Sequence, residues 1–440
     1  MNNKLSNVLR LAALAILIGF LLPASMAQES TAIEAVVLEI PDGAQAGPDF
    51  DVDTATSAYI NLLSEEDQAR SDAYFEGGYW LQLIGLGYGL GIAWLLLGTG
   101  LSTRMRNLAE RVGRWSWLHT YLYGAQYIVL TSVLIFPLTV YQYYFREHQY
   151  DLATQTFGAW MGDEVKGLLV GLILGGTAIT LIYGVIRKVK RAWWLWGTGV
   201  SVAFLLFIIF VAPVYIAPIF NDYQPLEDGP LRDSIISMAR ANGIPSDDVY
   251  WFDASKQSTR ISANVSGIFG TTRISLNDNL LNRTSTEEIE SVMAHEMGHY
   301  VLNHGMKLLT YMGLLLAVGF AFIAWAFNRA VSRWGQNWGI RDIGDTAGLP
   351  LFLALLSVYF FLASPAFNTV IRVHESEADN YGINVSGQPD GFARAAIRLS
   401  EYRKISPGPV ERFIFYDHPS GYDRVHMSMV WKSEHQDRNK

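Results

Sequence analysis

The sequence predicts a mostly α-helical membrane protein with six spanning helices and one small polar module of helices and strands. Half of the 440 residues are hydrophobic and only 17% are charged, whereas about 25% of the residues in soluble domains are charged. Six apolar stretches approach the roughly 20 residues that a helix needs to cross a bilayer. Aromatic side chains crowd the ends of these stretches, as they do at membrane–water interfaces.

The overall charge and the lack of one residue type exclude several classes of function. The net charge of −8 argues against nucleic-acid binding, which normally requires a basic patch. The sequence contains no cysteine, which excludes disulfide bonds, thiolate zinc sites and cysteine nucleophiles. Any metal ion must therefore be held by histidine, aspartate or glutamate.

Residues 1–27 are typical of an export signal. A basic start precedes an apolar run from Leu11 to Leu22, and Ser25-Met26-Ala27 offers small residues at a cleavage site. The alternative is an uncleaved first membrane helix, which would be a seventh span. Residues 28–76 then form an acidic segment outside the membrane, with a helix expected around Ala58 to Tyr74.

Four of the predicted spans fall within residues 77–220 and two within residues 307–366. The competing interpretation, a buried core of a soluble domain, would have to accommodate six long apolar helices at once. We therefore expect these segments to cross a bilayer. The predicted spans are Gly78–Gly100, Trp117–Val140, Gly167–Ile186, Trp193–Ile216, Leu308–Phe327 and Leu349–Ala363.

The connections between the spans predict an orientation. The loops after the first, third and fifth spans are basic, and because lysine and arginine determine orientation these loops are predicted to be cytoplasmic. The polar module and the C-terminal tail then lie outside, which favours a bacterial inner membrane with this module on the periplasmic side. The basic residues are Arg104, Arg106, Arg111, Arg114, Arg187, Lys188, Lys190, Arg191, Arg329, Arg333 and Arg341.

Residues 221–306 form the polar module between the fourth and fifth spans. An amphipathic pattern predicts a helix that ends before Gly243, and runs of β-branched and aromatic residues predict short strands after it. A capping box then opens another helix. The predicted elements are a helix over Pro230–Asn242, strands over Val249–Phe252, Ile261–Ile268 and Arg273–Leu276, a turn at Gly270-Thr271-Thr272, and a box of Ser285 with Glu288 or Thr284 with Glu287.

The helix that follows the capping box contains His295-Glu296-Met297-Gly298-His299. Two histidines four residues apart lie on one helical face, so both imidazoles can reach a single ion. Glu296 lies beside them, where a general base that activates water is needed. The small Gly298 would let another element approach the metal. The alternative is a helix with two surface histidines.

A catalytic zinc ion needs a third protein ligand and one open position. Glu375 and Asp379 share one face of a predicted helix, so Glu375 can bind the metal while Asp379 accepts a hydrogen bond from a ligating histidine. Glu377 competes for the ligand role but lies on another face of the helix. Read alone, this acidic helix is a solvated surface, and its pairing with the histidine helix favours Glu375 as the ligand.

Three other histidines and one arginine are candidates for supporting roles. His418 and Arg424 belong to a cluster that could stabilise the oxyanion of a tetrahedral intermediate, although a His-Pro turn at a surface is ordinary. His304 is predicted to be structural at the end of the metal helix. His374, beside Glu375, is predicted to support the site or to lie on the surface.

Several separate stretches are similar to one known family. The chain resembles the M48 membrane metalloproteases, and within them the CAAX prenyl protease 1 (Ste24-type) branch. The resemblance runs in order from about Gly78 to the end of the chain. The matching stretches are Thr156-Phe157-Gly158 through Asp163-Glu164-Val165-Lys166, Ile216 to Asn221 with Pro225 to Gly229, Ser255-Lys256 with Asn264 and Gly267, His295 to His299 with His304, Asn368, Arg372, Glu375, Ala378 and Asp379, and His418-Pro419-Ser420 with Arg424.

The resemblance implies a fold and a set of residue roles. Membrane helices would surround a water-filled chamber, capped by a zincin-like α+β domain that is completed by residues 367–440. Asn264 would lie on an edge strand that pairs with the peptide backbone. The resemblance also implies that one zinc ion is held by His295, His299 and Glu375, that Glu296 is the catalytic base, that Asp379 supports the zinc site, and that His418 and Arg424 contact substrate or oxyanion.

The sequence therefore predicts an integral-membrane zinc metalloendopeptidase that hydrolyses peptide bonds in peptide or protein substrates. The segment Gln257 to Ile261 is less basic and less polar than its counterpart in the family, so the resemblance does not fix the substrate. Both a prenylated tail and another membrane-associated protein are candidates. An endopeptidase for quality control of membrane proteins is an alternative of the same family. An intramembrane protease and a metal-binding transporter or scaffold are further alternatives.

Overall fold

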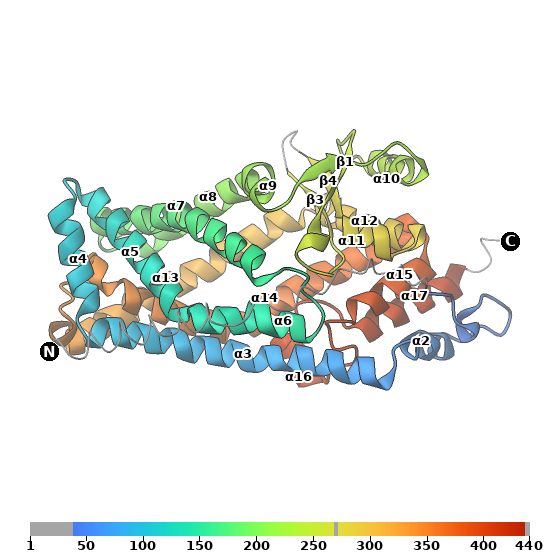
Figure 1. The fold of residues 1–440 in the computed structure, drawn as a ribbon, viewed down its shortest axis with the longest axis horizontal. Helices are drawn as coiled ribbons and strands as arrows, with labels where there is room; N and C mark the ends of the chain where they lie inside the picture. The colour runs from blue at the N-terminus through green and yellow to red at the C-terminus, as the bar shows by residue number, and fades with distance from the viewer. Residues whose placement is uncertain (1–37, 268–271, 436–440) are drawn as a thin grey trace.

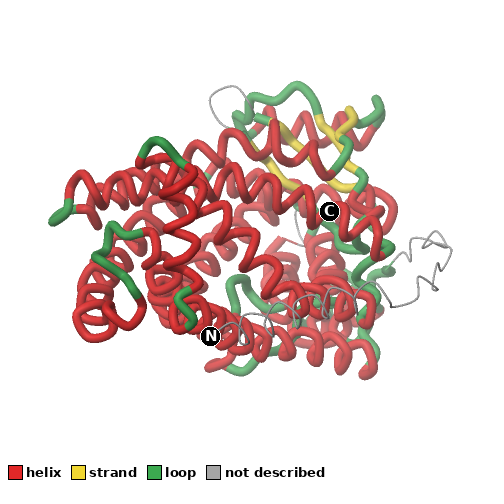
Figure 2. Tube along the Cα trace, turned by 60° about the vertical axis from the view of Figure 1, so that its left-hand side comes forward, coloured by secondary structure: helices red, strands yellow, loops and turns green. Residues whose placement is uncertain are grey.

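The computed structural model describes residues 38–267 and 272–435, and helices dominate it (Figures 1 and 2). The predicted export signal or first membrane helix lies outside the described residues, as does most of the predicted turn at Gly270 to Thr272. Long helices fill one end of the molecule in Figure 1. A small sheet and a set of shorter helices occupy the other end.

Among the described residues, six helical segments are long and apolar enough to cross a bilayer, in agreement with the six predicted spans. Each is longer than the apolar stretch that predicted it, because polar turns extend the helices beyond the hydrocarbon region. The segments are Glu65–Gly98, Ser116–Gln149, Phe157–Val189, Trp193–Phe220, His304–Trp338 and Thr346–Ser386. They contain the helices α3 (Glu65–Gly98), α5 (Ser116–Val140), α6 (Arg146–Gln149), α7 (Phe157–Val189), α8 (Trp193–Val211), α9 (Ala217–Phe220), α13 (His304–Trp338) and α14 (Leu349–Ser386).

The acidic segment before the first span differs from the prediction. We expected one helix around Ala58 to Tyr74, but the structure has α2 (Val52–Ile60) and a separate start of α3 at Glu65. The hydroxyl of Ser64 accepts a hydrogen bond from the backbone N–H of Asp67 at 3.1 Å. This N-cap, followed by acidic residues in the first turn, begins a new helix at that point.

The last span and the helix of the third metal ligand are one element. We predicted a span over Leu349–Ala363 and a separate helix after it, whereas α14 runs unbroken through Pro365 to Ser386. At 1.5 Å per residue its 38 residues extend about 57 Å. A single helix thus passes from the membrane region into the metal centre (Figure 1).

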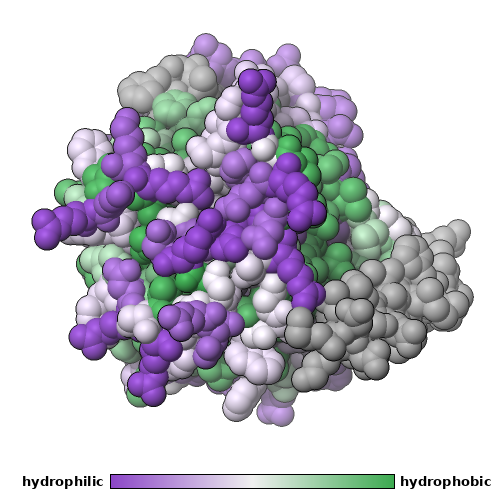
Figure 3. All heavy atoms as spheres, turned by 90° about the vertical axis from the view of Figure 1, so that its left-hand side faces the viewer, coloured by the Kyte–Doolittle hydropathy of each residue, from purple (hydrophilic) through white to green (hydrophobic). Residues whose placement is uncertain are grey.

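The three basic connections meet at the end of the molecule that lies opposite the sheet (Figure 1). Arg106 of α4 (Leu101–Val112) forms a buried ion pair of 2.6 Å with Asp345, which precedes α14. Arg187, at the end of α7, donates to the carbonyl oxygen of Gly344 at 2.9 Å. Figure 3 views this end and shows hydrophilic side chains gathered on it.

The polar module contains a four-stranded sheet in the order β1-β2-β4-β3. β2 pairs in parallel with β4, while β1 and β3 pair antiparallel with their neighbours, so β3 is an edge strand. The strand β1 (Tyr223–Pro225) was missed because it is short and contains proline. The other strands were predicted, with β3 shorter than expected: β2 (Val249–Phe252), β3 (Ala263–Ser266) and β4 (Arg273–Asn277).

The helices of the module pack on the sheet and place α12 beside β3. Ile274 and Leu276 of β4 are fully buried against Met293 and Met297 of α12. This apolar contact holds the motif helix against the sheet. The helices are α10 (Pro230–Ala241), α11 (Asp278–Arg283) and α12 (Thr286–Val301).

The C-terminal region completes the sheet end of the molecule with α15 (Pro389–Leu399), α16 (Pro409–Phe415) and α17 (Gly421–His435). The helix α2 packs on α15 and α17 through a shared apolar core. The ammonium group of Lys432 contacts both carboxylate oxygens of Asp390 at 2.7 Å, and the hydroxyl of Tyr59 donates to the same carboxylate at 2.7 Å.

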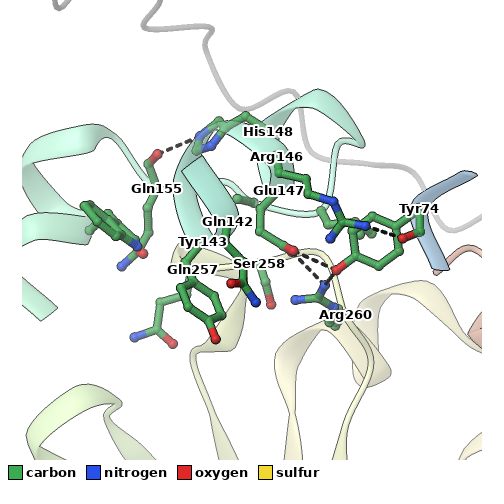
Figure 4. A pocket seen from close by; sticks show the side chains of 13 residues that line it. Tyr74, Gln142, Tyr143, Arg146, Glu147, His148, Gln155, Gln257, Ser258 and Arg260 are labelled. Atoms are coloured by element: carbon green, nitrogen blue, oxygen red, sulfur yellow. Dashed lines mark hydrogen bonds and ion pairs between the residues drawn. The ribbon is translucent and has the colours of Figure 1, made fainter. Parts of the chain in front are cut away.

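A charged junction joins the membrane helices to the polar module (Figure 4). Glu147 of α6 accepts hydrogen bonds from the hydroxyl of Tyr74 and from Arg260, both at 2.6 Å. Arg260 lies in the segment that leads into β3. These residues line a cavity of about 270 Å³ between the two parts.

Candidate metal centre

The histidine motif lies on α12, whose start is set by a capping box of Ser285 and Glu288. The alternative box at Thr284 does not form. The Nε2 atoms of His295 and His299 lie 3.1 Å apart. Spacing of four residues on a helix brings the two rings together on one face.

Glu375 reaches the two histidines because α12 and α14 approach closely. A Cβ atom at Gly382 would lie 2.8 Å from the backbone nitrogen of His295, and one at Gly298 would lie 3.1 Å from the Tyr381 ring. The carboxylate oxygens of Glu375 come within 3.4 Å of the Nε2 atoms of both histidines. Glycine at both crossing positions makes this approach possible.

The three side chains come close enough to share one metal ion. Ligand atoms about 2.0–2.1 Å from a tetrahedral ion lie about 3.3–3.4 Å apart; the two Nε2 atoms are 3.1 Å apart, and each lies 3.4 Å from a different carboxylate oxygen of Glu375. Two imidazoles and one carboxylate are a donor set that binds zinc in catalytic sites. His295, His299 and Glu375 are the group of potential ligands found among the residues that the structure describes.

Asp379 and Arg424 contact the candidate ligands and hold them in position. Asp379 Oδ1 lies 2.8 Å from Nδ1 of His295, so that nitrogen carries the proton and Nε2 presents a lone pair. Arg424, on α17, donates to Asp379 at 2.9 Å and to Glu375 at 3.1 Å. Its side chain is buried, so the guanidinium compensates two carboxylates that lie almost out of reach of water.

A second chain of hydrogen bonds orients His299. Glu377 lies 2.9 Å from Nε2 of His304, and a carboxylate accepts, so His304 carries its proton on Nε2. Nδ1 of neutral His304 then accepts from Nδ1 of His299 at 2.8 Å, which leaves the lone pair of His299 Nε2 for a metal. The sequence suggested Glu377 only as a competing ligand.

The remaining predicted histidines lie close to this network. His304 is the first residue of α13 rather than the end of the metal helix, because Asn303 adopts a left-handed conformation that separates the two helices. The ring of His374 stacks on that of His304, with centroids 4.6 Å apart. His418 places Nε2 3.3 Å from Glu375 and Nδ1 2.7 Å from Asp417.

Burial and neighbouring charges shift the pKa values of the site. Burial raises the pKa of Glu296 above that of an ordinary glutamate, so this side chain holds a proton more readily than one in water. Burial would lower the pKa of His295, but the carboxylates of Asp379 and Glu375 outweigh it and raise this pKa. Burial lowers the pKa of His418.

A cavity of about 180 Å³ opens beside the donor set. Two of the three candidate ligands, His295 and Glu375, line it, and His299 does not. Glu296, Asp379, His418 and Arg424 also line it, so the predicted catalytic residues converge on one space. The segment Ile261 to Ala263, which leads into the edge strand β3, forms another wall. Asn264 is the next residue of β3 and pairs with Ser275 of β4.

Two family models match the chain consecutively. The model of the CAAX prenyl protease N-terminal part, described as five membrane helices, matches residues 53–222, which hold four of the six candidate spans. The model of peptidase family M48 matches residues 225–428, which include the whole donor set. The chain belongs to peptidase family M48.

Curated relatives in this family support the assignment. The chain is 28% identical over 411 residues to the uncharacterized metalloprotease YhfN of Bacillus subtilis, covering 92% of this chain and 94% of that protein. It is 27% identical to CAAX prenyl protease 1 of Saccharomyces cerevisiae, covering 67% of this chain and 69% of the relative. A CAAX prenyl protease 1 homolog of rice is 28% identical, with 70% and 72% covered.

A solved structure confirms the fold. The crystal structure of Ste24p from S. mikatae matches with a TM-score of 0.72 and 23% sequence identity, covering 84% of this chain and 90% of that one. The predicted fold class, mostly helical with membrane helices around a chamber and a small α+β region, is therefore correct. Family and fold together make this M48 protein an integral-membrane metalloprotease that acts on peptide or protein substrates.

Proposed function

We propose that this M48 protein is a zinc metalloendopeptidase in which His295, His299 and Glu375 hold one zinc ion and Glu296 is the general base. The observation that carries the proposal is the convergence of two imidazoles and one carboxylate, close enough to share one ion, beside a cavity that Glu296 lines. When bound, zinc supplies a Lewis acid that polarises the scissile carbonyl and lowers the pKa of water.

The side chains around the donor set have three further roles: proton transfer, orientation of the ligands and stabilisation of the oxyanion. Glu296 takes a proton from the attacking water and passes it to the leaving amine, and its raised pKa suits both transfers. Asp379 keeps the Nε2 lone pair of His295 directed at the ligand position, and Glu377 does so for His299 through His304. Arg424 and His418 line the cavity, where they can donate to the oxygen that gains negative charge.

The edge strand β3 provides the binding surface for the substrate backbone. Its outer side carries backbone groups that an extended peptide can pair with, and Asn264 lies at the centre of this strand. A peptide added there would pass the cavity that holds Glu296. We therefore propose an extended segment of a membrane-associated protein as the substrate. The proposal covers both prenylated and unprenylated proteins.

The basic connections favour an orientation with the metal centre outside. They gather at the end of the molecule that lies opposite the sheet (Figure 1), and the positive-inside rule assigns that end to the cytoplasm. We propose a bacterial inner membrane with the metal centre on the periplasmic side. A reporter fused after Lys440 should then give an external signal, and a cytoplasmic signal would reverse the orientation.

The alternatives differ in their support. An intramembrane protease would carry the motif inside a span, but α12 lies outside the six candidate spans. A transporter or scaffold has no support because the chain matches a peptidase family across the motif. Quality-control cleavage of membrane proteins uses the same residues and remains the alternative within the family.

The proposal is tested by cleavage of matched farnesylated and unfarnesylated CAAX peptides with purified, zinc-loaded protein. Glu296→Gln should keep its zinc but lose at least about 100-fold in rate, the usual scale for a general base. Glu290→Gln is the matched control, since Glu290 is on the same helix but bonds to Ser234. Undiminished turnover by zinc-loaded Glu296→Gln would exclude this role.

The choice of peptide separates the two substrate classes. Cleavage of the lipidated peptide alone would assign a prenylated tail and call for a new test of the orientation. Equal cleavage of both peptides would assign a general membrane-associated endopeptidase.

A further inference from the structure

The cavity at the junction of the membrane helices and the polar module contains a buried positive charge. Its walls come from α3, from the end of the second span, from α7 and from the segment before β3 (Figure 4). Arg146 is one of the lining residues and is only 7% exposed. Burying a charge is costly unless an opposite charge and hydrogen bonds replace the lost water. A guanidinium in this position therefore favours an anion beside it.

Arg146 differs from the other buried arginines. Every other buried arginine among the described residues forms an ion pair with a carboxylate. These pairs are Arg106 with Asp345, Arg394 with Glu287, Arg398 with Glu288 and Arg424 with Glu375. Within the same part of the chain, Arg146 has no carboxylate at ion-pair distance. Its guanidinium donates to the carbonyl oxygen of Tyr74 and lies 4.1 Å from the centre of that ring. These contacts leave its other N–H groups without a bonded acceptor.

The carboxylates around the cavity are already paired with other cations. Glu147, the one acidic residue among the described lining residues, accepts a hydrogen bond from Arg260 at 2.6 Å. Asp163 bonds to two amides of the cavity wall and forms an ion pair of 3.0 Å with Lys166. The charges of Glu147 and Arg260 thus cancel, and the excess positive charge of the cavity belongs to Arg146.

Two neutral side chains add hydrogen-bonding groups to this cavity. The amide of Gln142 and the hydroxyl of Ser258 line it, and neither side chain has a hydrogen-bond partner within the described ranges. A guanidinium binds phosphate through two parallel hydrogen bonds, while amide and hydroxyl donors can bond to the remaining oxygens. The volume of about 270 Å³ leaves room for such a group. A phosphate has more acceptor oxygens than a carboxylate, so it can use all of these donors.

The cavity also borders the part of the surface where lipid headgroups are expected. The second span ends in a π-helix, η2 (Tyr141–Phe145), directly before α6, and π-helical turns are frequent at functional sites. Tyr141, Tyr143 and Phe145 of this segment are exposed, as aromatic side chains are at a membrane–water interface. Tyr143 lines the cavity as well. A headgroup at the bilayer surface therefore lies next to the cavity.

We propose that this cavity binds the phosphate of a phospholipid headgroup, with Arg146 as its ion-pair partner and Gln142 and Ser258 as neutral donors. Ser258 belongs to the segment before β3, so a bound headgroup would attach the polar module to the bilayer surface. The inference does not depend on the proposed peptidase function. A free phosphate ion has the same chemistry, and the test separates the two sources.

The test measures binding to the purified full-length protein in a neutral detergent after native lipid has been removed. The probes are phosphatidylglycerol, a diacylglycerol with the same chains but no phosphate, and inorganic phosphate. Wild-type protein should bind phosphatidylglycerol about 10-fold or more tightly than the diacylglycerol in native mass spectrometry, the scale expected for charge-assisted hydrogen bonds. Tighter binding of inorganic phosphate than of phosphatidylglycerol would overturn the lipid as the source and keep the phosphate site.

Variants of the cavity show whether it is the site. Gln142→Glu places a carboxylate on the cavity wall, where it can pair with Arg146 and repel a phosphate. This variant should lose the preference for phosphatidylglycerol while its unfolding temperature without lipid stays at or above the wild-type value. Arg146→Lys should keep part of the preference because it keeps the charge without the planar fork.

Arg70→Gln is the matched control. Arg70 pairs with Asp151 on the surface near the same junction but does not line the cavity, so this variant should bind lipid as the wild type does. Ser258→Asp places a carboxylate on a different wall and gives an independent result if Gln142→Glu does not fold.

Three results would overturn the inference. One is equal affinity of the wild type for phosphatidylglycerol and the diacylglycerol. Another is an unchanged preference in both Gln142→Glu and Ser258→Asp. The third is an equal loss of preference in Arg70→Gln, which would show that binding follows the surface charge rather than the cavity. All three leave the peptidase assignment unchanged.

Discussion

The metal centre and the junction at Arg260 both join distant segments through charged side chains, but they differ in what those charges do. At the metal centre, Arg424 compensates Glu375 and Asp379, and these carboxylates in turn direct histidine lone pairs toward one point. At the junction, Glu147 accepts from Tyr74 and Arg260, and the guanidinium of Arg260 also lies 5.3 Å from the ring of Tyr402. One network prepares a ligand site, whereas the other holds two parts of the molecule together.

The two networks are nevertheless connected through one short segment. Arg260 directly precedes Ile261, which lines the cavity of the metal centre. The junction therefore fixes the position of the wall along which the substrate is proposed to lie. Changes at the metal centre should affect the metal and turnover, while changes at the junction should affect stability and substrate binding.

The largest effect is expected from Glu375→Gln. An amide cannot supply the negative charge of the third ligand, and Arg424 would lose one of its two carboxylates. We expect metal affinity and peptide cleavage to fall by about 100-fold or more, beyond the range seen for outer-sphere changes. Metal content by elemental analysis and cleavage of the same peptide measure both, and wild-type values for either would contradict the ligand assignment.

Arg424→Gln should have the next largest effect. It leaves Glu375 and Asp379 close together without their shared cation, and breaking a buried pair costs about 3–5 kcal/mol. We expect metal affinity to fall about 10- to 100-fold. Titration with zinc should restore cleavage only at higher concentration, and cleavage restored at the wild-type concentration would show that Arg424 does not support the ligands.

Glu147→Gln tests the junction and should spare the metal. The side chain of Arg260 is 35% exposed, so water weakens the pair and we expect a loss of about 1–2 kcal/mol. Thermal unfolding in detergent should shift to lower temperature, with unchanged zinc content and a raised KM. Loss of zinc from this variant would show that the two networks are not separable.

The smallest effect is expected from Tyr74→Phe. This change removes one hydroxyl that donates to Glu147 and accepts from Arg260, while the ion pair between those two residues stays. A hydrogen bond of this kind contributes about 0.5–1.5 kcal/mol. The unfolding temperature should fall less than in Glu147→Gln, and a larger fall would place the hydroxyl, rather than the ion pair, at the centre of the junction.

The sequence by itself determined the membrane class, the number of spans and the motif helix. These features depend on local patterns: length of apolar stretches, charge of the connections, and histidines four residues apart. The choice of Glu375 over Glu377 also came from helical periodicity, and the structure brings Glu375 to the histidines. The helix around Ala58 to Tyr74 was wrong because the Ser64 cap, a local signal, was overlooked.

Only the tertiary structure decided how the site is supported. The chain from Glu377 through His304 to His299 and the burial of Arg424 against two carboxylates both join elements far apart in sequence. The periodicity of residues within one helix does not predict such contacts, because hydrogen bonds between separate helices depend on how those helices cross. The crossing of α12 and α14, which two glycines permit, places these groups around a single cavity.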